Sequence, residues 1–142
     1  MSDLSNYLEE EVLNTYLRAG TATVPTNTYL AIFDDTASAA ELEAGTLTNE
    51  ITSYTGDRPR VDNILTAASQ VGGAAQVATD ADVDYEDMPA TTVQWAAVID
   101  SASGAGNVLA YAQSTDGGGA GTSVSAGATF RVASGDFTFD LD

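Results

Sequence analysis

The 142-residue chain carries 21 acidic residues against four arginines, which gives a formal net charge of −17. A charge of this size repels nucleic acid and anionic membranes, and it therefore argues against direct DNA or RNA binding and against a membrane partner. Lysine is absent, and the acids are spread through the whole sequence. Because salt screens the repulsion between surface carboxylates, this pattern indicates adaptation to a saline environment.

The chain has neither cysteine nor histidine. Disulfides, thiolate nucleophiles, cysteine-ligated metals and catalytic units that need an imidazole are therefore excluded. The sequence shows neither the basic flank of a signal peptide nor an apolar run of membrane-spanning length. We expect a protein that is made and folded in the cytoplasm, or assembled from there, as one domain, residues 1–142.

The N-terminal segment, residues 1–20, predicts an amphipathic α-helix, because apolar residues recur there at helical spacing. Ser2 or Asp3 would cap its start. The apolar face has two interpretations: it packs on the sheet of its own domain, as the stability of most helices requires, or it docks on a partner subunit. The residues of this face that we assign to a candidate interface are Leu4, Tyr7 and Leu8.

About seven short strands follow, separated by turn residues and by one long connection at residues 36–57 with a short helical turn at 37–45. One face of the strand at 91–100 is predicted to carry Val93, Trp95, Ala97 and Ile99. The last two strands are predicted to form a hairpin around Ser134–Gly135. This pattern predicts a mainly β fold, an antiparallel β-sandwich or jelly-roll-like domain over residues 26–142 with an N-terminal helix. The predicted strands are residues 28–35, 60–68, 74–86, 91–100, 107–114, 128–133 and 136–142.

Acidic and glycine-rich motifs give weak candidates for sites. Asp80, Asp82 and Asp84 have the alternate spacing of a calcium loop, but Tyr85 and Thr91 stand where such a loop needs glycine and glutamate. We expect non-specific cations around the acids and no specific cofactor. The glycine-rich stretches lack the residues that bind phosphates or dinucleotides. No set of residues suited to general acid–base catalysis is singled out, so the sequence predicts no enzyme.

The order of five segments is informative: residues 4–17, 26–35, 56–61, 88–113 and 125–142. Taken in this order, they resemble a family of small virion proteins of tailed viruses. The resemblance covers most of the chain apart from residues 36–50, and it departs from the family pattern where Asp57 and Pro59 interrupt a turn. It implies a multicopy structural role without catalysis, described in the family as head decoration or as tail-fibre-like. The acidic surface suggests a haloarchaeal host.

The first functional prediction is a capsid decoration or cement protein that binds the major capsid protein or other virion subunits as a homo-oligomer such as a trimer. The alternative is a tail-fibre or baseplate-associated protein that contributes to host recognition. A recognition surface should expose aromatic side chains, and the candidates are Tyr54, Tyr85 and Trp95, of which Trp95 fits a core position better. A hydrolase of envelope polymers is a third class without a supporting residue set.

Half of the positive charge lies in one short stretch, at Arg58 and Arg60, and we assign both residues to the candidate interface. An arginine in so acidic a chain is expected to face a fixed carboxylate, because its planar guanidinium can bind one through two hydrogen bonds. Arg60 matches the turn arginine of the resembling family. Two interpretations remain open for it: it anchors its loop to a neighbouring subunit, or it pairs with acids of its own domain.

Overall fold

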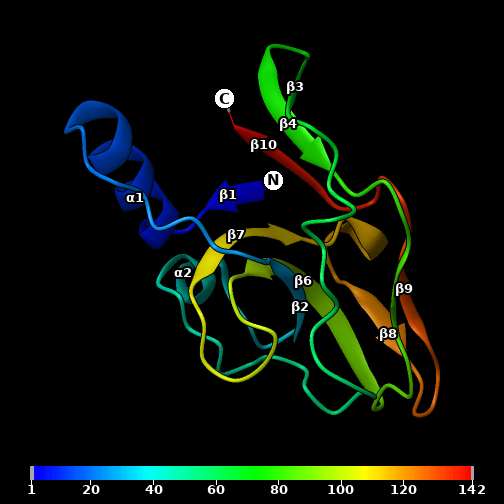
Figure 1. The fold of residues 1–142 in the computed structure, drawn as a ribbon. Coiled ribbons are helices and arrows are strands. Elements are labelled where there is room, and N and C mark those ends of the chain that lie inside the picture. The colour runs from blue at the N-terminus through cyan, green and yellow to red at the C-terminus, as the bar shows by residue number, and fades with distance from the viewer. Residues whose placement is uncertain (1, 142) are drawn as a thin grey trace.

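The computed structural model describes the backbone of residues 2–141 and the side chains of residues 4–139. Within that range it is mainly β, with two α-helices and a short 3-10 helix (Figure 1). The helices are α1 (Asn6–Leu17), α2 (Ala39–Glu43) and the 3-10 helix η1 (Asp116–Gly118). The strands are β1 (Ser2–Leu4), β2 (Tyr29–Asp34), β3 (Ser69–Val71), β4 (Ala74–Ala78), β5 (Val83–Tyr85), β6 (Thr91–Ile99), β7 (Val108–Gln113), β8 (Thr122–Val124), β9 (Phe130–Val132) and β10 (Thr138–Leu141).

The central sheet is antiparallel and has the strand order β1-β7-β6-β2, with β8 paired to β6. Strand β6 is its axis: Ile99 pairs with Tyr29 of β2, and Ala96 pairs with Ala112 of β7. The apolar runs of β2 and β6 form strands here because β-branched and aromatic side chains fit a pleated surface that is covered on both faces.

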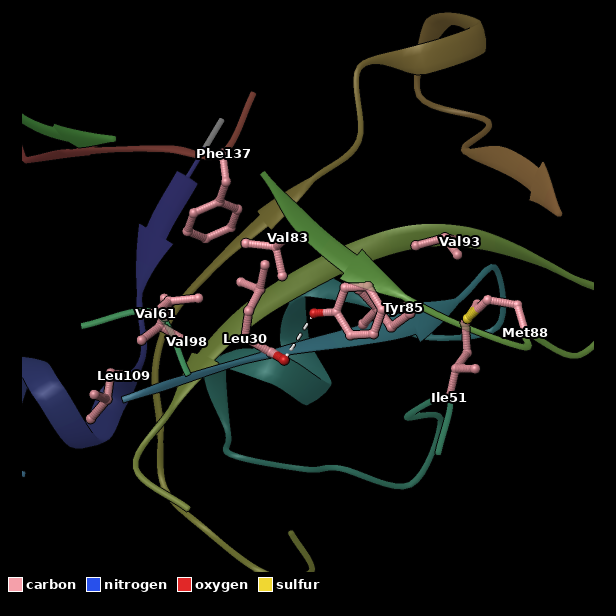
Figure 2. Packing of buried hydrophobic residues seen from close by; sticks show 11 residues of the cluster. Leu30, Ile51, Val61, Val83, Tyr85, Met88, Val93, Val98, Leu109 and Phe137 are labelled. Atoms are coloured by element: carbon pink, nitrogen blue, oxygen red, sulfur yellow. Dashed lines mark hydrogen bonds between the residues drawn. The ribbon is translucent and has the colours of Figure 1, made fainter. Parts of the chain in front are cut away.

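A second layer covers one face of this sheet. It consists of the pair β5-β9 and the segment that enters β10, which supplies Phe137, while the sheet β10-β4-β3 adjoins β1 and β7 through β10. Figure 2 shows the core between the layers, where Tyr85 of β5 points toward Leu30 of β2 and donates a 2.9 Å hydrogen bond to its carbonyl oxygen. This antiparallel arrangement confirms the predicted fold class, a β-sandwich with an N-terminal helix. We call the cluster of buried residues between the two layers the inner core. Its buried members are Leu30, Ile32, Ile51, Val61, Val83, Tyr85, Met88, Val93, Val98, Leu109 and Phe137.

The opposite face of the central sheet is covered by α2 and the connection that follows it. Phe33 of β2 and Ile99 of β6 are fully buried there beneath Leu42 of α2. The short helix begins at a capping box in which Ser38 and Glu41 bind each other's backbone amides. The short helical turn predicted at residues 37–45 is therefore confirmed.

The N-terminal segment differs from the prediction. The helix begins at Asn6, with Ser5 as its N-cap, and the residues before it form β1. In β1, Leu4 pairs with Ala110 of β7. The pairing explains the difference: the free edge of β7 binds the backbone of these residues, and so they do not extend the helix.

Four strand predictions were wrong in detail. The strand predicted at 74–86 is two strands, β4 and β5, which belong to different sheets. Residues 60–68 form no strand; Val61 instead reaches the inner core from a loop in which the Ile64 amide binds the Val61 carbonyl at 2.9 Å. The predicted 134–135 hairpin does not form, because β9 pairs with β5 while β10 pairs with β4. Val93 packs on the inner core, opposite Ala97 and Ile99, because the register of β6 shifts at this end of the sheet. Among residues 2–141, no helix is long and apolar enough to cross a membrane.

Candidate functional site

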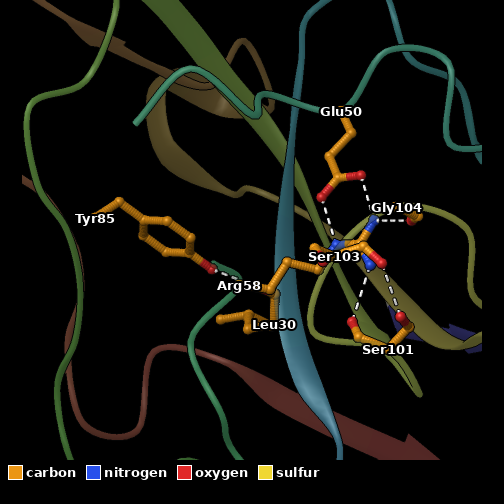
Figure 3. Close-up of polar contacts among 7 residues, drawn as sticks. All are labelled: Leu30, Glu50, Arg58, Tyr85, Ser101, Ser103 and Gly104. Carbon is orange, nitrogen blue, oxygen red and sulfur yellow. Dashed lines mark hydrogen bonds and ion pairs between the residues drawn. The ribbon is translucent and has the colours of Figure 1, made fainter. Parts of the chain in front are cut away.

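Arg58 lies in a loop and holds two other loops together. Its Nε and one terminal nitrogen donate to the two carboxylate oxygens of Glu50, both at 2.6 Å. The terminal nitrogens also donate to the carbonyl oxygens of Ser101 at 2.9 Å and Gly104 at 2.7 Å (Figure 3). We call this group of contacts the Arg58 clamp. The clamp joins the connection after α2, which carries Glu50, to the turn between β6 and β7, which carries Ser101 and Gly104.

The Arg58 clamp is an internal feature of the domain. Arg58 is 5% exposed, and the hydrogen bonds that it donates to the Glu50 carboxylate raise its pKa above the usual value. A buried guanidinium is tolerated only when its donors are satisfied, and here four acceptors surround it. The structure thus places Arg58, a candidate interface residue, in a contact with its own chain, and the cation positions two loops.

Arg60 differs from Arg58 in exposure. It binds both carboxylate oxygens of Asp62, at 2.8 and 2.7 Å, and its side chain is 51% exposed. This contact lowers the pKa of Asp62 to about 2, and the Thr28 amide, which donates to the same carboxylate, adds to the effect. Arg60 therefore meets an acid of its own domain, one of the two interpretations given above, while a neighbouring subunit as a further partner stays a prediction.

The acidic run of the weak calcium candidate lies along β5. Asp84 and Asp82 both bind Arg131 of β9, at 2.6 and 3.0 Å, so this guanidinium supplies the positive charge that a cation would otherwise bring. Asp80 is exposed and precedes the strand. Among the described residues, no group of three acidic, histidine or cysteine side chains is placed to hold a metal ion.

The predicted interface residues of the N-terminal segment lie on the inner side. Tyr7 and Leu8 pack against the inner core, and Leu4 is half-buried in β1. The exposed side of α1 carries other apolar residues that the interface prediction omitted, although their spacing was visible in the sequence. We call these residues the α1 outer face: Val12 (37% exposed), Leu13 (55%), Tyr16 (81%) and Leu17 (77%).

A cavity of about 530 Å³ lies between the central sheet and the segment of β9 and β10. Its apolar lining includes Ile32, Ala96 and Ala112, and its polar lining includes Asp136 and Thr138. On one side it is bounded by the loop after β7. Two glutamine side chains hold this loop by donating to the same carbonyl oxygen, that of Gly119: Gln94 at 2.6 Å and Gln113 at 3.2 Å.

The three aromatic candidates for recognition occupy different environments. Tyr85 is fully buried, and Tyr54 packs edge-on against it with ring centres 5.0 Å apart. Burial raises the pKa of Tyr54 to about 12, so its hydroxyl stays neutral. Trp95 is half-buried, packs against Tyr111 and is among the residues that line the cavity. Of the three, Trp95 alone adjoins this cavity.

The fold and these surfaces define a small β-sandwich protein with an exposed apolar helix and internally paired arginines, features that suit a structural subunit. The model of the family described as "Podophage GP4 fiber I protein gp80" matches residues 3–140, so the chain belongs to this family. It is a structural protein of a tailed virus and a component of the virion. No curated protein matches the chain. The family description supports the fibre alternative over the first prediction, capsid decoration.

Proposed function

We propose that the chain is a non-enzymatic subunit of a viral tail fibre and that it contributes to host recognition by binding a neutral sugar of the host surface. The family description supports the fibre role. The cavity beside β10 is the observation that carries the recognition role, since its volume falls in the range of about 300–1,000 Å³ usual for ligand sites.

The lining of the cavity combines an apolar floor with hydrogen-bond acceptors. The side chains of Asp136 and Thr138 have no hydrogen-bond partner within the described part of the chain, and both line the cavity. The side-chain amides of Gln94 and Gln113 donate to the Gly119 carbonyl oxygen. The side-chain oxygen of Gln94 is left as a further acceptor. A ligand rich in hydroxyl groups can donate to these acceptors while its C–H face lies on Ala96 and Ala112.

Charge favours a neutral ligand over an anionic one. Asp116 and Asp136 both line the cavity, and the chain as a whole carries −17. Arg131 also lines it, but its guanidinium already binds Asp82 and Asp84. A phosphate or an acidic sugar would therefore meet repulsion without an available cation. A neutral pyranose avoids this cost.

The recognition role is tested by titrating the purified chain with methyl glycosides of glucose, galactose, mannose and N-acetylglucosamine. Trp95, the single tryptophan of the chain, reports binding by fluorescence, and amide NMR shifts locate it. We expect Asp136→Ala to weaken binding by about tenfold, which equals about 1.4 kcal/mol. The matched control, Asp35→Ala, removes an exposed acid outside the cavity lining and leaves the affinity unchanged. Weak binding has a dissociation constant of about 1 mM. The absence of amide NMR shifts at glycoside concentrations up to about 50 mM therefore contradicts the recognition role.

The fibre role is tested separately by the copy number per virion, measured by quantitative mass spectrometry and normalised to the major capsid protein. A ratio of a few copies per hundred capsid subunits supports the fibre. A ratio near one returns the protein to the head as a decoration subunit. The trimer, contact with the major capsid protein and the haloarchaeal host stay predictions.

A further inference from the structure

Helix α1 is short and lacks the burial that normally stabilises a helix. It has 12 residues, and none of them is buried. Isolated helices of fewer than about 12–15 residues are marginal in water, so most protein helices depend on packing of an apolar face. In α1 the turns that carry the α1 outer face are without such packing. A binding partner would provide it.

Among the described residues, the contacts that fix α1 to the body of the protein come from its first turn. Ser5 is fully buried; its hydroxyl donates to the Val108 carbonyl, and its amide donates to the Leu109 carbonyl at 3.0 Å. Tyr7 and Leu8 complete this attachment on the inner core. In Figure 1 the remaining turns project away from the sheets. The direction of the helix is thus set at its base, while the α1 outer face remains accessible.

A further exposed apolar residue lies in the segment that follows the helix. Val24, in the segment that follows, is 80% exposed. This segment is held beside the helix by the Thr23 amide, which donates to the Glu11 carboxylate at 3.1 Å, and by the Gly20 amide, which donates to the Asn14 carbonyl at 2.9 Å. Single exposed apolar residues need no explanation, but the four grouped on the α1 outer face mark an interaction site.

The charge around the α1 outer face identifies the kind of partner. Glu9 and Glu10 are exposed on the same helix. A second copy of the chain has few cations to meet them, because three of its four arginines are held in ion pairs with its own acids. The fourth, Arg18, donates to Asn14 in the same helix. Self-association through α1 would therefore bring acid against acid.

We propose that the α1 outer face binds a different protein of the same virion, in an apolar groove whose rim carries lysine or arginine. The apolar side chains supply the driving force, and the basic rim meets Glu9 and Glu10. This attachment is independent of the sugar site, because none of the residues that line that cavity belongs to α1.

The absence of lysine gives a direct test. Carbodiimide coupling joins a carboxylate to an amine without a spacer, and the sequence offers no lysine of its own. In purified virions we expect Glu9 or Glu10 to be coupled to a lysine of another virion protein, identified by mass spectrometry. Coupling only to α-amino groups of identical copies, or no coupling of these two residues, overturns the proposal.

A pair of variants makes the test specific. Leu13→Ser with Leu17→Ser should lower incorporation into virions by about tenfold or more, because two apolar side chains no longer become buried. The matched control, Val71→Ser, removes an exposed apolar residue from β3 and should leave incorporation unchanged. Thermal denaturation establishes that both variants are folded. Wild-type incorporation of the folded double variant contradicts the proposal.

Discussion

Replacing Arg58 by methionine should destabilise the protein strongly, whereas replacing Arg60 by methionine should not. Methionine keeps much of the aliphatic length but removes the charge and all four hydrogen bonds of the Arg58 clamp. The Glu50 carboxylate, whose side chain is 5% exposed, then remains buried without its cation. An uncompensated buried charge of this kind costs about 3–5 kcal/mol.

Arg60→Met is the matched control, because it removes an identical charge from an ion pair at the surface. Its side chain is 51% exposed, so solvent and salt screen the pair and it adds little to stability. For a chain of this length, about 3 °C of melting temperature corresponds to each kcal/mol. We therefore expect Arg58→Met to melt about 10–15 °C below the wild type and Arg60→Met within about 3 °C of it.

The measurement is urea denaturation followed by the fluorescence of Trp95, with thermal melting by circular dichroism as a second observable. Adding Glu50→Gln to Arg58→Met should recover at least about 1 kcal/mol, because the stranded carboxylate is neutralised. If the free energies of unfolding of the two arginine variants agree within about 1 kcal/mol, burial does not decide how much each ion pair, Arg58–Glu50 or Arg60–Asp62, contributes to stability. That result would refute the reasoning.

Three further predictions concern single side chains. Tyr85→Phe removes the donor to the Leu30 carbonyl and should lower the free energy of unfolding by about 1–3 kcal/mol in urea titrations; no change would indicate that water replaces the hydroxyl. Gly121→Ala should cost about 2 kcal/mol or more in the same assay, since φ is +83° and the new Cβ would lie 2.5 Å from the Val93 oxygen. The folded-state pKa of Asp62, about 2, lies below its ordinary 3.8, so its contribution is present above about pH 4 and disappears as the pH falls toward 2. The melting temperature of Asp62→Asn should accordingly lie below that of the wild type at pH 6 and converge with it near pH 2, and a constant difference would contradict the assignment.

The strands that could be predicted from sequence are those with strong local patterns. The apolar run at 28–35 became β2, and the run at 91–100 became β6, each within about two residues of its predicted bounds. Strands β1 and β8 have three residues each and no pattern of their own. They form because β7 and β6 offer backbone groups to pair with, which is information from the tertiary structure alone.

The functional surfaces were predictable only in part. Helical periodicity gave an apolar stripe on α1, but it could not show that Tyr7 and Leu8 would face the core while Leu13 and Tyr16 stay exposed. The density of acids likewise predicted that an arginine would find a carboxylate. Which arginine becomes buried depends on Glu50, a residue in a connection without periodic pattern, and is visible only in the folded chain.

The strand order of the central sheet has a consequence for folding. Strand β2 pairs with β6, whose residue Ile99 lies 70 positions after its partner Tyr29. Strand β1 cannot pair until β7 has been made, because the partner of Ser2 is Ala112 of β7. Pairings so distant in sequence form slowly, and during synthesis the apolar run of β2 stays unpaired until β6 emerges. Unpaired β-prone segments invite aggregation between chains. The dense negative charge opposes such encounters, so the same carboxylates that surround the finished virion subunit also keep the nascent chains apart.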